Sequence, residues 1–134
     1  MGISGFEHRM KKQKFSISQK LKSFIYAFNG LRILIQKEHN ARIHLFATLC
    51  VIVAGFLFNI SSTEWLAIIF SIGLVFSLEI INSSIEHMAD FISPEKHEKI
   101  KTIKDLAAAG VLISTLTALI IGLLIFIPKI FTLC

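Results

Sequence analysis

Three long apolar runs, separated by short polar stretches, dominate the pattern of the chain. They cover residues 43–60, 65–85 and 106–127. Since a helix rises 1.5 Å per residue, each run would extend about 27 to 33 Å, which matches the hydrocarbon core of a bilayer. None of the runs carries the polar outward face that a soluble three-helix bundle requires. The pattern therefore predicts an all-α membrane protein with three transmembrane helices.

A further helix is expected before the first run, over residues 18–37. Its apolar residues recur at helical spacing, and basic and polar residues fill much of the remainder. Those apolar positions are Leu21, Phe24, Ile25, Phe28, Leu31 and Ile35. Such a helix is typical of one that lies on a membrane surface, either as an anchor alone or as a wall of a site. Residues 1–17 are polar and basic and are interpreted as a tail, which leaves 18–134 as a single membrane domain.

Composition and charge narrow the class of protein. The chain has 134 residues, 54% of them hydrophobic, and a mean hydropathy of +0.69. Its formal net charge is +5, but the basic residues flank the apolar runs and form no separate face, so nucleic acid is not expected as a partner. Cys50 and Cys134 form no pattern typical of a disulfide framework or a zinc site.

The distribution of Lys and Arg predicts the orientation in the membrane. Nine of them precede Ile43, none lies between the first two runs, four lysines lie between the second and third, and only Lys129 follows the third. Cytoplasmic loops carry an excess of Lys and Arg. The N-terminus and the second connection are therefore expected in the cytoplasm, and the C-terminus outside.

Acidic residues mark one face of the second span. On a helix Glu79, Asn82, Glu86 and Asp90 fall within an arc of about 80° and form a stripe from the membrane interior to its cytoplasmic edge. For Asp90, and less so for Glu86, a solvated helix end explains the charge equally simply. Glu79 lies well inside the apolar run, where an ionisable residue indicates function by default.

Complementary charge begins the third span. Lys104 and Asp105 are followed by three alanines and Gly110, which allow another helix to approach closely. We expect Lys104 and Asp105 at the depth of Glu86. Carboxylates and a lysine at a membrane surface suit Mg²⁺ and nucleotide phosphates, although no Walker loop is present.

These residues resemble a known family. The runs "EIINSSIEHMAD" and "PEKHEKIKTIKDLAAAGVLI", with "NGLR" and "KEHNARIH" before them, are similar to the small bacterial membrane lipid kinases, which phosphorylate diacylglycerol or undecaprenol. The similarity extends from about Phe24 to Phe126. It implies ATP and Mg²⁺, a membrane lipid alcohol as acceptor, a homotrimer with shared sites, and a location in the bacterial inner membrane with the active site facing the cytoplasm.

The resemblance also implies roles for individual residues. Glu79 is implied as the general base at the lipid hydroxyl, with Asn82 beside it, and Glu38 and Glu86 as metal-holding carboxylates at the nucleotide. The further residues implied to contact nucleotide are Tyr26, Asp90, His97, Lys104 and Asp105, and Arg32 is implied at the lipid.

Two departures from the Gram-negative pattern, Ala108 and His44, favour undecaprenol over diacylglycerol by analogy. His44 itself is interpreted as a helix-packing residue. A proton-coupled transporter, with Glu79 as the proton carrier, is a more distant alternative. It gives no reason for Glu86, Lys104 and Asp105 to cluster on the cytoplasmic side.

Overall fold

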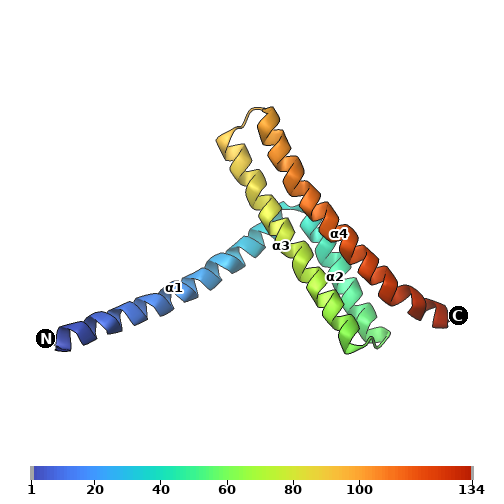
Figure 1. Ribbon diagram of the computed structural model, residues 1–134, viewed down its shortest axis with the longest axis horizontal. Helices are drawn as coiled ribbons and strands as arrows, with labels where there is room; N and C mark the ends of the chain where they lie inside the picture. The colour runs from blue at the N-terminus through green and yellow to red at the C-terminus, as the bar shows by residue number, and fades with distance from the viewer. Residues whose placement is uncertain (1, 134) are drawn as a thin grey trace.

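The computed structural model describes the backbone of residues 2–133, and the side chains within it except at positions 2, 3, 6 and 10–15. The described residues form four α-helices and no strand. These are α1 (Gly2–Lys37), α2 (His39–Leu57), α3 (Ser62–Ile92) and α4 (Glu98–Leu133) (Figure 1). Helices α2, α3 and α4 are each long and apolar enough to cross a membrane. The prediction of an all-α protein with three spans is confirmed at that level.

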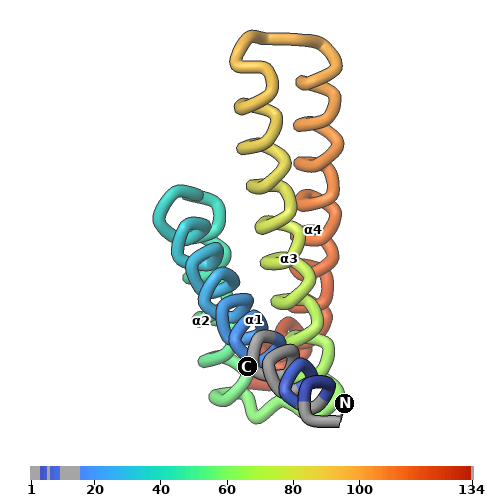
Figure 2. Tube along the Cα trace, turned by 90° about the vertical axis from the view of Figure 1, so that its left-hand side faces the viewer, coloured from blue at the N-terminus to red at the C-terminus, as the bar shows by residue number. Residues whose placement is uncertain are grey.

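Helices α3 and α4 form a long antiparallel hairpin, and α2 packs beside part of it. Both views show α3 and α4 side by side, with their connecting loop well beyond the end of α2 (Figures 1 and 2). The hairpin therefore extends past the junction of α1 and α2. Its tip carries the last turns of α3 and the first turns of α4.

Helix α1 leaves the bundle and runs away from it (Figure 1). Its described side chains are exposed from Ser16 to Ile33, and Leu34, at 3% exposure, is its first buried residue. The helix begins at Gly2, so the stretch interpreted as a tail is helical here from Gly2 onward and continuous with the helix expected over 18–37.

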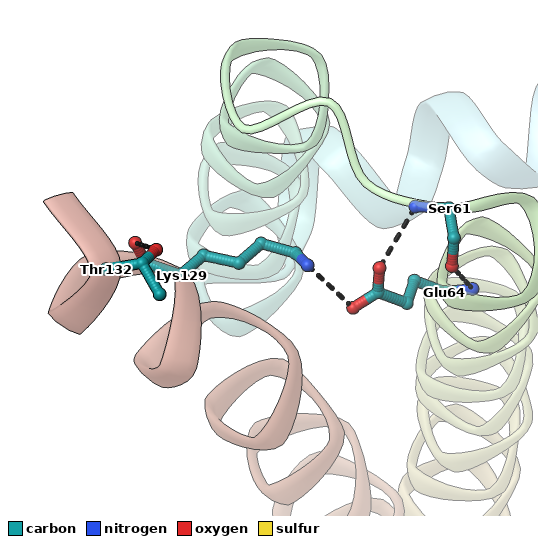
Figure 3. A network of polar contacts seen from close by, with 4 residues as sticks. All are labelled: Ser61, Glu64, Lys129 and Thr132. Atoms are coloured by element: carbon teal, nitrogen blue, oxygen red, sulfur yellow. Dashed lines mark hydrogen bonds and ion pairs between the residues drawn. The ribbon is translucent and has the colours of Figure 1, made fainter.

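The second predicted span is longer than its apolar run. Helix α3 continues to Ile92, two turns past the end of the apolar run near residue 85, and so includes Glu86 and Asp90, as the predicted acidic stripe requires. Its start is fixed by a capping box, in which Ser61 Oγ accepts from the Glu64 N–H at 3.2 Å and Glu64 Oε1 accepts from the Ser61 N–H at 3.0 Å. Glu64 also pairs with Lys129 of α4 at 3.1 Å (Figure 3).

The apolar core lies toward that same end of the bundle. Ile60, Ile68 and Ile125 are buried together, and Trp65 packs against them. Gly55 permits the close approach of α2, because a Cβ atom there would lie 2.6 Å from Trp65 Cη2. The capped end of α3 is thus held by this packing together with the Glu64–Lys129 ion pair.

Candidate active site between α2 and α3

The site centres on Glu79, a carboxylate buried on α3. The residue is 4% exposed, although it belongs to a helix that is otherwise apolar enough to span a membrane. Its Oε1 lies 3.1 Å from Nε2 of His44 on α2. The distance suits a hydrogen bond, but the alignment does not, and Oε1 has no hydrogen-bond partner among the described residues. The carboxylate therefore retains its capacity to accept a proton or a hydrogen bond.

One turn further along α3, Ser83 binds the start of α2. Ser83 Oγ donates to Glu38 Oε1 at 3.0 Å. Glu38 is the N-cap residue of α2, with φ −101° and ψ 112°, and its own side chain caps no backbone N–H. The carboxylate is therefore directed to α3 rather than into its own helix. Since Ser83 and Glu86 lie three residues apart, they share a face of α3, and Glu38 is drawn toward that face.

Three carboxylates consequently surround one region. Glu38 and Glu86 both lie close enough to Glu79 for their charges to act on its carboxylate. Among the described residues, no three His, Cys, Asp or Glu side chains converge tightly enough to enclose a metal ion. Mg²⁺ is usually bound by one or two carboxylates, with phosphate oxygens and waters completing the octahedron. The pair Glu38 and Glu86 fits that kind of site.

Asn82 adds a second unpaired polar atom. Its Oδ1 is buried and has no hydrogen-bond partner among the described residues, as is also true of Glu79 Oε1. Buried polar atoms are nearly always hydrogen-bonded, and each exception calls for an explanation. A bound ligand that donates hydrogen bonds to both residues would explain these two.

The hairpin tip forms a separate hollow of about 450 Å³ beyond this region. Asp90, His97 and Lys104 all line it. Lys104 Nζ pairs with Asp90 Oδ1 across the hairpin, so the lysine reaches Asp90 rather than the expected level of Glu86. His97 accepts a hydrogen bond from the Lys99 N–H through Nδ1 at 3.1 Å, and it thereby caps the first turn of α4.

An apolar groove lies on the other side of Glu79, among α2, α3 and α4. Its volume is about 370 Å³, and His44, Val75 and Leu119 are among its lining residues. On α3 the groove follows Ile68, Ile72 and Val75, whose helical spacing leads directly to Glu79. The buried carboxylate thus lies one turn beyond Val75, the last residue of α3 that lines this groove, on the side toward the hairpin tip.

The residues predicted from the sequence are not all brought together. Glu38, Asn82 and Glu86 gather around Glu79, while Asp90, His97 and Lys104 gather at the hairpin tip. Asp105 instead pairs with Lys101 at 2.7 Å on an exposed surface. Tyr26 and Arg32 are exposed on α1 and are not brought to either region within one chain; Tyr26 is 69% exposed.

Two contacts were missed at the level of sequence. His44 was interpreted as a packing residue, yet its ring contacts the central carboxylate. Nothing in the sequence linked Ser83 to Glu38, which lies 45 residues earlier in the chain. For His44 and Glu79 the available signal was a polar residue inside each of two apolar runs, since such residues tend to contact one another across packed helices. Glu38 precedes the first run, so no such signal pointed to its contact with Ser83.

Comparison with known proteins places the whole of this region inside one family. A family model described as prokaryotic diacylglycerol kinase matches residues 25–126. The undecaprenol kinase of Bacillus subtilis (strain 168) is 39% identical over 123 residues, which cover 92% of this chain and 96% of the relative. The diacylglycerol kinase of Synechocystis sp. is 29% identical over 96% of this chain and 75% of its own length. That of Escherichia coli (strain K12) is 33% identical over 75% of this chain and 82% of its own.

Proposed function

The chain belongs to the prokaryotic diacylglycerol kinase family, and from this premise we propose that it transfers the γ-phosphate of ATP to the hydroxyl of undecaprenol. The resemblance found in the sequence is confirmed, and with it lipid kinase activity. Diacylglycerol is the alternative acceptor. The observation that carries the proposal is the buried Glu79 carboxylate at the junction of an apolar groove and a polar helix end.

Glu79 is the general base of the proposed reaction. The hydroxyl oxygen of the lipid forms a bond to the γ-phosphorus, while the bond from that phosphorus to the bridging oxygen of ADP breaks. The hydroxyl proton passes to the Glu79 carboxylate, and ADP leaves. The buried Glu79 carboxylate can accept that proton, and Asn82 can hydrogen-bond to the hydroxyl beside it.

Glu38 and Glu86 would hold Mg²⁺. The bound ion would neutralise negative charge on the phosphates of ATP. Ser83 supports this role because it keeps Glu38 on the face of α3 that carries Glu86. Lys104 would contact a phosphate. Asp90 and His97, at the hairpin hollow, would lie toward the adenosine, and Asp105 would complete the nucleotide contacts once released from Lys101.

We place the protein in the bacterial inner membrane, with its N-terminus and active site in the cytoplasm and its C-terminus outside. The four lysines between the second and third apolar runs, in the loop and the first turns of α4, support this orientation. Helix α1 would lie on the cytoplasmic leaflet as an amphipathic helix. Its exposed apolar side chains support that position, since Phe24, Ile25 and Phe28 are 64% to 68% exposed.

The working unit is proposed to be a homotrimer with shared sites. One chain leaves Tyr26 and Arg32 exposed on a helix that runs away from the bundle (Figure 1). A neighbouring subunit would bring its hairpin to them. Such sharing would let Tyr26 contact the nucleotide and Arg32 the lipid, which one small bundle cannot arrange by itself.

Undecaprenol is preferred for two reasons. The relative named undecaprenol kinase is 39% identical, while the two diacylglycerol kinases given above are 29% and 33% identical. The departures from the Gram-negative pattern at Ala108 and His44 also favour undecaprenol, by analogy.

A direct assay tests the proposal. Purified full-length protein in mixed micelles receives labelled ATP, Mg²⁺ and either undecaprenol or a diacylglycerol at equal mole fraction. We expect label in both lipids, with the higher initial rate on undecaprenol. Glu79→Gln should transfer almost no label to either lipid. Glu7→Gln is the matched control and should label them as the wild type does, because Glu7 is exposed and lies outside the region matched to the family. A folded wild-type protein that labels neither lipid would refute the kinase, and a faster rate on diacylglycerol would reverse the preference.

A further inference from the structure

His44 occupies a position that ordinary packing does not explain. Its ring reaches Glu79 with Nε2 at 3.1 Å from Oε1, and the exposed fractions of the two side chains are 21% and 5%. His44 is also a lining residue of the apolar groove. The His44 side chain thus contacts Glu79 and also lines the apolar groove beside it.

Apart from His44, no group among the residues that the structure describes holds the Glu79 carboxylate in one position. Glu38 and Glu86 repel it, whereas the contact with His44 attracts it. Burial leaves Oε1 without an aligned hydrogen bond among the described residues. An isolated buried carboxylate is costly, and it turns away from like charge when nothing restrains it. His44 Nε2 is the donor already within reach, and a small rotation of the ring would align its N–H with Oε1.

We propose that His44 is a positioning residue, whose Nε2–H holds one oxygen of Glu79 and leaves the other to the hydroxyl of the lipid alcohol. This inference rests on the kinase reaction proposed above. Nε2 donates in this arrangement, so the proton of the alcohol still passes to Glu79. His44 does not contact the phosphates or exchange protons with the substrate. It fixes where the base stands at the mouth of the groove.

Substitution at position 44 separates this role from packing. His44→Met introduces an apolar side chain of similar length and removes the N–H donor. His44→Gln instead places an amide N–H near the position of Nε2. We expect His44→Met to lower kcat about 10- to 100-fold, as loss of an orienting partner commonly does. KM for ATP and for the lipid should stay within about twofold, since ground-state binding is unchanged. His44→Gln should recover most of kcat.

The matched control is His8→Met, the same change at an exposed histidine on α1 outside the family match. Its kcat should equal that of the wild type. His44→Asn is a further variant in case His44→Met does not fold, because its shorter amide fails to reach Glu79 and should behave as Met does. Helix content and the melting temperature in detergent establish folding for each variant.

A double substitution tests whether His44 acts through Glu79. In a Glu79→Gln background there is no base left to position, so His44→Met should reduce the residual rate by less than about twofold. An unchanged kcat in folded His44→Met, equal losses in the Met and Gln variants, or the same fold loss in the Glu79→Gln background would each overturn the inference. These outcomes all presuppose an active wild type, whereas an inactive wild type would refute the kinase itself.

Discussion

Ser83 Oγ donates a hydrogen bond to Glu38 Oε1 at 3.0 Å and so joins α3 to the residue between α1 and α2. Glu38 is half-buried and makes no cap for α2, so this bond is what orients its carboxylate. The contact places a candidate Mg²⁺ ligand from the start of α2 on the face of α3 that carries Glu86. The geometry of the proposed Mg²⁺ site should therefore depend on Ser83, to which no metal contact is assigned.

Ser83→Ala should raise the Mg²⁺ concentration for half-maximal activity. One hydrogen bond contributes about 0.5 to 1.5 kcal/mol, which corresponds to roughly a 2- to 10-fold rise. Mg²⁺ titration of the initial rate at saturating ATP measures it. Ser84→Ala is the matched control, because Ser84 Oγ donates only to the Ile80 carbonyl on an exposed face. An equal rise in both variants would indicate a general effect on α3.

Glu79→Gln and Glu86→Gln should affect different steps. Glu79→Gln removes the base and should lower kcat about 10²- to 10⁴-fold, while the Kd for Mg–ATP stays nearly unchanged. Glu86→Gln removes a metal ligand and should raise that Kd about 10-fold or more. Initial rates combined with equilibrium binding of a fluorescent ATP analogue separate the two quantities. Equal loss of nucleotide binding in both variants would show that the division of roles is wrong.

Hydropathy was sufficient to find the three spans but not their ends. The apolar run of the second span stops near residue 85, while α3 continues to Ile92. A bilayer requires apolar side chains only where lipid surrounds them, and the backbone hydrogen bonds of a helix continue into water. The same reason explains why α1 begins at Gly2, since its polar half shows no apolar periodicity from which to predict a helix.

The candidate site was predictable in part for a related reason. Glu79 could be selected from the sequence because an ionisable residue inside an apolar run usually has a functional role. The contact of His44 with Glu79 depends on how α2 packs against α3, which the sequence of either helix alone does not determine. The positions of Tyr26 and Arg32 relative to a site would depend further on the homotrimer proposed above. Their roles remain predictions.

Lys104→Met should weaken ATP binding more than Asp90→Asn does. Charge-assisted hydrogen bonds contribute about 1.5 to 3 kcal/mol, so loss of a phosphate contact should raise KM for ATP by about 10-fold or more. The ion pair of Lys104 with Asp90 is partly exposed, with side-chain exposures of 36% and 65%, and such pairs contribute about 0 to 1 kcal/mol. Asp90→Asn should accordingly change KM less than about fivefold.

Lys99→Met provides the comparison for charge alone, because Lys99 is exposed in the same segment but does not line the hairpin hollow. Its KM for ATP should match that of the wild type. If Lys99→Met and Lys104→Met raise KM for ATP equally, the lysines at the start of α4 attract ATP only through their summed charge. Lys104 then makes no individual contact with a phosphate.

Gly55→Ala should destabilise the opposite end of the bundle without affecting the chemistry. The added Cβ would lie 2.6 Å from Trp65 Cη2 and 3.2 Å from Ile60 Cδ1, so the indole must move. Trp65 also contacts the ring of Phe56, with ring centroids 5.0 Å apart, which limits how far the indole can move. Overpacking of this kind costs about 1 to 3 kcal/mol. Because Trp65 is the single tryptophan of the chain, its fluorescence during thermal or denaturant unfolding in micelles reports the change directly.

Gly73→Ala is the control, since a Cβ at Gly73 meets no atom within 4 Å, and it should leave the unfolding midpoint unchanged or raise it slightly. Trp65→Phe combined with Gly55→Ala should recover part of the loss, because the smaller ring vacates the space that the new methyl group needs. Since this variant lacks the tryptophan, its unfolding is followed by circular dichroism and compared with that of Trp65→Phe alone. The kcat of folded Gly55→Ala should stay within about twofold of the wild type, since Gly55 packs at the capped end of α3 and Glu79 lies toward the hairpin tip. A large loss of kcat at full folding would mean that packing at the capped end controls the position of Glu79.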